Sequence, residues 1–429
     1  MGVALMWSKC LLIAGSLAAL CVLAYGRSLF LPFISDDYIQ IELARKWGPA
    51  SGWIGLAQDV LYRTRATSLI TTYWIEQLFG LDPISFNLSG LILHFVNCLL
   101  VALTGFWHRI GWRISLAAAG FFAVHQAHQE AVIWHAALPE LLVFACVLLS
   151  VLAWIRWLET GDWRFYASAA IAFLAALFSK ESAVAVVPIL ALLTMIETGT
   201  FRRLLWVGPF LLTALAYFWS IYAAHDSHLH FNDGTFSLQA PVWFVLPRSV
   251  SRLLWVSGYL SLILIAVTRS WRRLPLIGLS LVWMAITFAP YSFLTYMPFV
   301  PSRHTYLASL GAAYIVAAGL WTLHERVRSR MAMASLAILL VGAQCFYLWT
   351  RKHRQYAERA APTEALLKSV ERMDANPIRL KCFPYSPLVA ESAVAIRLGR
   401  QVRFVQDHGD PATPADVDFC SAADASSGN

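Results

Sequence analysis

Charged residues are scarce in this sequence. Only 14% of its 429 residues are Asp, Glu, Lys or Arg, whereas 59% are hydrophobic, and the mean hydropathy is +0.59. Soluble globular domains carry about 25% charged residues, so this composition argues against a soluble protein and predicts a polytopic protein of the lipid bilayer. The sequence also has no CxxC or Cys/His ligand pattern, which argues against a structural zinc site.

The net charge of +8 does not indicate a nucleic-acid partner. The positive residues fall in short clusters between apolar runs, and the positive-inside rule of membrane proteins accounts for such clusters. No nucleic acid is therefore expected among the partners.

Apolar runs predict eleven transmembrane helices. No small-residue cleavage site follows the first run, so we interpret it as a membrane helix rather than a signal peptide. Every alternate loop is basic, which places the N-terminus in the cytoplasm and, with an odd number of spans, the C-terminal tail outside. Cations at 351–354 oppose this topology. The predicted spans are residues 3–25, 86–107, 114–134, 138–157, 164–179, 183–198, 204–224, 242–267, 274–295, 304–323 and 331–350.

The first outer loop, residues 34–85, is too polar to span but is rich in Trp and Tyr. Such aromatics are typical of the membrane interface, so we expect short helices lying along it. The loop opens with Asp36 and Asp37 directly after an apolar run. An acid inside the hydrocarbon layer costs about 2.5–3.5 kcal/mol, so the pair should lie where the chain has emerged into water. It is either a candidate site or the solvated end of a membrane helix.

The tail, residues 351–429, loses the long apolar runs and is predicted to form a small α/β domain that follows the membrane domain, residues 1–350. A helix over 356–375, strands at 378–383 and 402–406 and a helix over 387–399 suggest a βαβ unit. The last ten residues, rich in Ser, Ala and Gly, are expected to be disordered. Cys382 and Cys420 are the tail's only thiols, and in an oxidising compartment they can form a disulfide. In a cytoplasmic tail they would remain two free thiols.

Several polar residues interrupt the spans. His94 shares a helical face with Asn87 and Asn97, and interhelical hydrogen bonds are one explanation for that face. His125 and His128 could share a metal, but Glu130 would point away if the helix continued, so hydrogen bonding to a polar substrate is favoured.

Charged residues also gather at the outer ends of the spans. Lys180 and Glu181 could be a weak exposed ion pair, and Arg248 and Arg252 could extend to lipid headgroups. Arg303 and His304 lie at the mouth of the tenth span.

These residues occur in motifs whose order resembles that of the GT-C membrane glycosyltransferases. The motifs are ISDDY, YRTRATSL, LFGLDPISFNLSGLILHFVN, AAGFFAVHQAHQEAVIW, SKES and PSRHTYLASLG. Between about residues 30 and 310 the chain looks most like the transmembrane and tetratricopeptide-repeat O-mannosyltransferases and their bacterial relatives, without the repeat domain. It departs from them where Thr64 and Gln126 replace prolines that are frequent in the family.

The resemblance implies a GT-C fold and an inverting transfer of sugar, mannosyltransferase-like, from a polyprenyl-phosphate donor to a protein or glycan acceptor at the outer face. A bacterial plasma membrane and no cofactor are expected. Asp36 maps to the family's proton acceptor, with Asp37 beside it. Cations would stabilise the departing phosphate: Arg303 first, then Lys180, Arg248 and Arg252. Further substrate-binding candidates are Arg63, His94, His125, His128, Glu130, Glu181, His304 and Tyr306.

Two other classes compete with this interpretation. A transporter or flippase of a lipid-linked or anionic solute would place its site near the midplane and often shows repeated halves, neither of which is evident here. A membrane scaffold that presents the tail would leave the Asp36 and Asp37 pair without a purpose.

Overall fold

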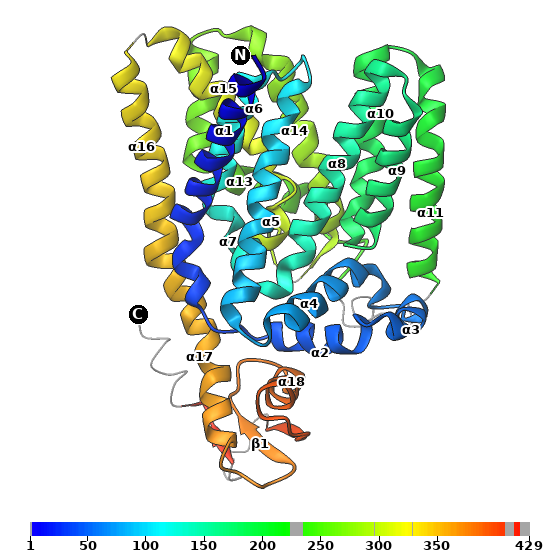
Figure 1. Ribbon diagram of the computed structural model, residues 1–429, viewed down its shortest axis with the longest axis vertical. Coiled ribbons are helices and arrows are strands. Elements are labelled where there is room, and N and C mark those ends of the chain that lie inside the picture. Colours follow the sequence, from blue (N-terminus) through cyan, green and yellow to red (C-terminus); the bar gives the residue numbers. More distant parts are fainter. Residues whose placement is uncertain (1, 224–234, 296, 328, 408–415, 421–429) are drawn as a thin grey trace.

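The computed structural model describes residues 2–223, 235–295, 297–327, 329–407 and 416–420. In this part of the chain a helix occupies each of the eleven predicted spans, and together they form a bundle (Figure 1). Eight helical stretches in the described residues are long and apolar enough to cross a membrane, and two shorter apolar helices, α6 and α9, lie among them. The bundle helices are α1 (Gly2–Tyr25), α5 (Pro83–Leu103), α6 (Trp112–Val124), α8 (Leu138–Thr160), α9 (Trp163–Leu177), α10 (Val186–Thr198), α11 (Gly208–Tyr222), α13 (Val242–Val267), α14 (Leu274–Phe288), α15 (Ser309–Arg326) and α16 (Arg330–Tyr347).

Helix α15 packs against α6, α13 and α14, and most of its residues are buried. Two glycines permit this close packing. A Cβ on Gly311 would lie 2.4 Å from the carbonyl oxygen of Ser280, and one on Gly319 would lie 2.4 Å from the Cβ of Ser261. Small residues at such contacts let membrane helices approach closely, since dispersion between helices replaces a hydrophobic driving force.

The third predicted span does not run to residue 134. Helix α6 ends at Val124, and the chain continues as a 3-10 turn, the short helix α7 (Gln129–Ile133) and a second 3-10 turn before α8. His125 marks the break: its Nδ1 accepts a hydrogen bond from the Ala127 amide at 3.0 Å, and its carbonyl accepts one from the Tyr25 hydroxyl at 2.7 Å. The prediction of one continuous helix over residues 114–134 is therefore wrong. At His125 the hydrogen bonds from the Ala127 amide and the Tyr25 hydroxyl stand where a continuing helix would have its backbone bonds.

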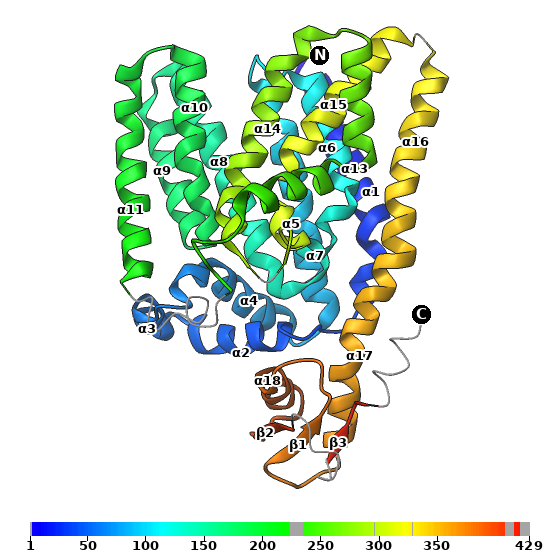
Figure 2. The ribbon, with the colours of Figure 1, turned by 180° about the vertical axis from the view of Figure 1, so that it is seen from behind.

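The first loop forms α2 (Asp37–Trp47), α3 (Trp53–Gln58) and α4 (Ala66–Phe79). As predicted, these are short helices, and they lie across one end of the bundle (Figures 1 and 2). We call this the loop end. The N-terminus lies at the opposite end (Figure 1).

The tail also lies at the loop end. A π-helical turn, Leu348–Lys352, joins α16 to α17 (His353–Val370), and β1 (Ile378–Lys381), α18 (Pro387–Leu398) and β2 (Phe404–Asp407) follow as the predicted βαβ unit. Strand β1 pairs in parallel with β2 and with β3 (Val417–Asp418). The expected Cys382–Cys420 disulfide is present and joins the end of β1 to the region after β3. Of the last ten residues, 420–429, which were expected to be disordered, Cys420 is described and bridged to Cys382, and 421–429 lie outside the described residues.

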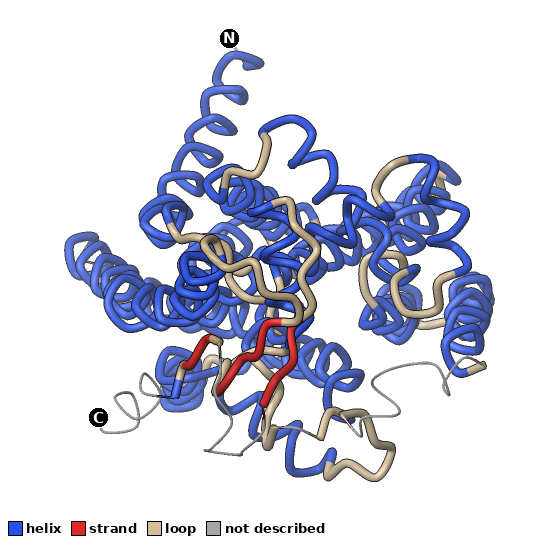
Figure 3. Tube along the Cα trace, turned by 90° about the horizontal axis from the view of Figure 1, so that it is seen from below, coloured by secondary structure: helices blue, strands red, loops and turns tan. Residues whose placement is uncertain are grey.

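The tail is not independent of the membrane part. Tyr38 and Ile41 of α2 share a hydrophobic core with Leu366 of α17 and Ala393 of α18. Across the same boundary the Tyr38 hydroxyl donates to Glu364 at 3.3 Å. Figure 3, seen from the loop end, shows the three strands in front of the helical bundle. The tail therefore packs directly on the loop that carries Asp36.

Candidate active site

Asp37 fastens the start of α2 to the bundle. One of its carboxylate oxygens accepts a hydrogen bond from the Ile34 amide at 2.8 Å, and the other accepts one from the Ala136 amide at 2.7 Å. The side chain is 2% exposed, and burial raises its pKa to about 7, although the two amides act in the opposite direction. Since both oxygens are occupied, Asp37 holds the loop rather than facing an open space.

The backbone before the pair is strained. Ser35 is buried and has a φ of +37°, a region that residues other than glycine rarely adopt. The bonds of Asp37 and a hydrogen bond from the Trp134 indole to the Ile34 carbonyl, at 3.3 Å, hold this conformation. A strained backbone conformation persists only where the surrounding structure holds it in place. Here the held conformation of Ser35 fixes the position of the next residue, Asp36.

Asp36 is half-buried, and among the described residues no side chain or amide donates a hydrogen bond to its carboxylate, on which the charges of Arg303 and Arg359 act. Burial raises its pKa above the usual value of an aspartate, and the nearby positive charges of Arg303 and Arg359 offset this effect only in part. A carboxylate with a raised pKa that is not committed to hydrogen bonds is a suitable proton acceptor.

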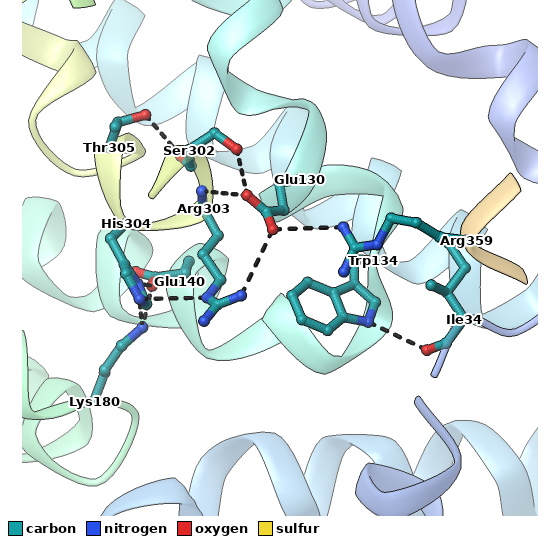
Figure 4. Close-up of polar contacts among 10 residues, drawn as sticks. All are labelled: Ile34, Glu130, Trp134, Glu140, Lys180, Ser302, Arg303, His304, Thr305 and Arg359. Atoms are coloured by element: carbon teal, nitrogen blue, oxygen red, sulfur yellow. Dashed lines mark hydrogen bonds and ion pairs between the residues drawn. The ribbon is translucent and has the colours of Figure 1, made fainter. Parts of the chain in front are cut away.

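Glu130 lies between the two arginines (Figure 4). One of its oxygens forms ion pairs of 3.6 Å with Arg303 and with Arg359, and the other accepts from the Ser302 hydroxyl and, at 3.0 Å, from the Arg303 amide. The two guanidinium groups also lie 5.0 and 4.6 Å from the ring centre of Trp134. Both cations are therefore held by one carboxylate and one aromatic ring.

A second polar cluster adjoins the first. Lys180 and His304 both contact the same oxygen of Glu140, and the Lys180 amine lies 3.0 Å from the His304 Nδ1. The other Glu140 oxygen accepts from the Tyr291 hydroxyl at 3.1 Å. The Arg303 Nε lies 3.3 Å from the His304 Nε2, so Arg303 connects the two clusters, as Figure 4 shows.

Glu181 and Arg63 lie beside Arg65 in the first loop's contact with the bundle. Glu181 forms an ion pair with Arg65 at 3.0 Å and accepts from the Thr64 hydroxyl at 3.0 Å. Arg63 donates to the backbone carbonyl of Ser220 in α11. These contacts tie the loop to the bundle without involving Asp36.

The remaining predicted residues lie elsewhere. His94, His125, His128 and Tyr306 form a buried group of rings inside the bundle, where the His94 Nδ1 lies 2.7 Å from the Tyr306 hydroxyl. Arg248 and Arg252 are exposed and stack on Phe244 and Phe299, respectively. The structure thus brings Asp36, Glu130, Arg303, His304 and Lys180 together and leaves these six residues outside that group.

Among the described residues, two groups of side chains are close enough to hold a metal ion. Cys21, His94 and Cys98 form one group, but both ring nitrogens of His94 already lie within 3.2 Å of Tyr306 and Ala123 oxygens. The second group includes Cys382 and Cys420, which are joined in a disulfide and offer no thiolate. Neither group contains Asp36 or Glu130.

Four residues of the site, Trp134, Arg359, Glu140 and Tyr291, were not predicted from the sequence. Glu140 carried a signal, because an acid in the first turn of an apolar span needs a partner. The cations after the last span were a second indication, because they contradict the positive-inside rule and so need another explanation. Arg359 itself lies beyond that cluster of cations, which occupies 351–354, and only the fold shows that it reaches Glu130.

Comparisons with known proteins bear on the fold. No protein-family model matches the sequence. Over 108 residues the chain is 35% identical to Protein O-mannosyl-transferase Tmtc1 of Drosophila melanogaster, and it spans 12% of that protein's length. Two solved structures match at a TM-score of 0.50: the Archaeoglobus fulgidus oligosaccharyltransferase, with 11% identity over 92% of this chain and 63% of that one, and apo ArnT from Cupriavidus metallidurans, with 14% identity over 95% and 87%. These likenesses show that the chain has a GT-C fold.

Proposed function

We propose that this protein is an inverting glycosyltransferase that moves a sugar from a polyprenyl-phosphate donor to an acceptor hydroxyl at the outer face of a bacterial plasma membrane. One observation carries the proposal: on a GT-C fold, the half-buried Asp36 stands at the start of α2 at the loop end of the bundle, close enough to Arg303 for the arginine's charge to act on its carboxylate. This arrangement supports roles for Asp36 as the proton acceptor and for Arg303 as the cation that binds phosphate.

The reaction follows from those two groups. The acceptor hydroxyl attacks the anomeric carbon of the sugar, and its proton passes to Asp36 as the new bond forms. The bond from that carbon to the phosphate oxygen breaks on the opposite side, so the configuration inverts. The donor is a phosphodiester with one negative charge. The polyprenyl phosphate that leaves is a monoester with two negative charges.

We assign to Arg303 the role of stabilising that charge. Its guanidinium is oriented by Glu130, Trp134 and His304, so it needs little reorganisation as the bond breaks. Lys180 is held by Glu140 and His304 beside it, and we assign it to the sugar or the phosphate. No metal is assigned a role.

The acceptor is proposed to be a protein or a glycan, and the sugar to be mannose-like. The names of the matched proteins support this choice, since one is a protein O-mannosyltransferase and another was solved with a tethered acceptor peptide. A flippase is the weaker candidate, because the charged cluster adjoins the loop that caps one end of the bundle.

The test is to incubate the purified protein with a panel of labelled polyprenyl-phosphate sugars and candidate acceptors and to measure release of free polyprenyl phosphate. Release that depends on acceptor and on one sugar supports the proposal. Movement of the intact donor between the leaflets of a vesicle, with no release, would indicate a flippase instead.

A further inference from the structure

We propose that Arg359, from the tail helix α17, is a second phosphate-binding residue, so that the donor phosphate is held between Arg359 and Arg303 and the tail completes the active site. The inference rests on the proposed function, because it names a further ligand of the same donor.

The geometry places Arg359 as the counterpart of Arg303. Both guanidinium groups contact the same oxygen of Glu130 at 3.6 Å, and both lie over the ring of Trp134 (Figure 4). A separation of 3.6 Å is too long for a hydrogen bond, so the N–H groups that face Glu130 are not saturated by it. An anion entering between the arginines could accept from both, since guanidinium groups bind phosphate through paired N–H donors.

The tail is built to hold Arg359 there. The π-helical turn, Leu348–Lys352, adds a residue to the helical turn where α16 becomes α17, and this changes the direction in which the later side chains face. Tyr356 is buried, and the Tyr385 hydroxyl donates to the Arg359 carbonyl at 2.5 Å. Since the guanidinium also lies 5.2 Å from the Tyr356 ring, two aromatic side chains restrict it.

Charge balance among Asp36, Glu130 and the two arginines favours two cations over one. Asp36 and Glu130 carry two negative charges, so with Arg303 alone the group would have a net charge of −1 and would repel a phosphate. Arg359 brings the net charge to zero, which allows the donor to bind. When Asp36 then takes the acceptor proton, the group becomes +1 as the leaving phosphate gains its second negative charge. The site therefore becomes more attractive to the phosphate as the transition state is reached.

The experiment measures binding separately from catalysis. The full-length protein in detergent is titrated with farnesyl phosphate, with farnesol as the uncharged comparison, for wild type, Arg359→Ala, Arg359→Gln and Arg303→Ala. The matched control is Arg354→Ala, because Arg354 lies on the same helix with its side chain exposed. We expect each site variant to weaken farnesyl phosphate binding by roughly tenfold or more and to leave farnesol binding unchanged, as is usual for loss of a charge-assisted hydrogen bond.

The outcomes separate this inference from the function it rests on. If Arg359→Ala and Arg359→Gln are folded and bind farnesyl phosphate like wild type, or if wild type does not distinguish farnesyl phosphate from farnesol, the inference is wrong. If the phosphate selectivity depends on Arg359 but no sugar is ever transferred, the binding site stands and the proposed function fails. If sugar is transferred and the donor KM of Arg359→Gln is unchanged, the function stands and Arg359 has no part in it.

Discussion

At the scale of single residues, two adjacent carboxylates have different environments. Both carboxylate oxygens of Asp37 accept hydrogen bonds from backbone amides. Asp36 is half-buried, and the charges of two arginines act on its carboxylate. From the sequence, only the family resemblance distinguished Asp36, as the proton acceptor, from Asp37. The physical difference between them depends on the Ala136 amide, 99 residues away from Asp37 along the chain.

We expect Asp36→Asn to abolish sugar transfer, with a loss of at least a hundredfold in kcat and little change in thermal stability, because the amide keeps the size of the side chain but cannot take the acceptor proton. Asp37→Asn should instead lower the unfolding temperature, since an amide has one acceptor oxygen for two backbone donors. The measurements are polyprenyl phosphate release and thermal unfolding of each variant. Near-normal turnover in Asp36→Asn would remove Asp36 from the mechanism.

The pH dependence of transfer should report the same carboxylate. Burial raises the pKa of Asp36, so kcat/KM should be constant at high pH and fall as the pH drops through a midpoint above the ordinary aspartate pKa. Arg303 and Arg359 lower that pKa, and removing either charge should therefore move the midpoint upward. The pH profile of Arg303→Ala, with Arg354→Ala as control, checks the sign. A downward shift of the midpoint in Arg303→Ala would contradict the assignment of that midpoint to Asp36.

Removal of metal ions is a further test at this scale. The groups of described residues that could hold a metal do not include Asp36 or Glu130, and arginines are placed to meet the charge of the leaving group. We therefore expect EDTA to leave the rate of transfer unchanged. A loss of activity that Mg²⁺ or Mn²⁺ restores would show that the arginines are insufficient.

At the scale of elements, the apolar pattern was enough to locate the eleven bundle helices, and helix and strand signals located the βαβ unit of the tail. It failed at residues 125–137, where apolar residues continue but the helix does not. Two hydrogen bonds mark the end of α6: one comes from Tyr25 of another helix, and the other is accepted by the His125 side chain. A hydropathy pattern cannot indicate either bond. That break carries Glu130 and Trp134, so the pattern failed at the residues that organise the site.

Close helix packing gives the prediction at this scale. Gly319→Ala should destabilise the bundle by about 1–3 kcal/mol, because the new methyl group would lie 2.4 Å from the Cβ of Ser261 on α13. Gly342→Ala on α16 is the matched control, since no atom lies within 4 Å of its added Cβ. Thermal unfolding in detergent should show a lower midpoint for the first variant only. Equal midpoints would mean that α13 and α15 are packed less closely.

At the scale of the whole molecule, the tail and the first loop act as one unit at the loop end. The core that joins α2, α17 and α18 fixes where α17 stands, and through it where Arg359 meets Glu130. The sequence predicted the tail's elements but treated it as a separate domain, because its contacts with α2 join residues more than 300 positions apart.

The tail's disulfide reports the compartment in which that unit lies. Cys382 and Cys420 form a disulfide, and the tail lies at the opposite end of the bundle from the N-terminus. If the loop end faces the oxidising side of the membrane, the bridge persists in cells. It closes a loop with a sequence separation of 38, for which chain entropy gives roughly 3–4 kcal/mol of stabilisation. In intact cells a membrane-impermeant thiol reagent should label the tail only after reduction, while Cys420→Ser should expose Cys382 without a reductant. Labelling of both cysteines in untreated wild-type cells would contradict the bridge. Labelling of Cys420→Ser by permeant reagents alone would place the loop end, and with it Asp36, on the cytoplasmic side.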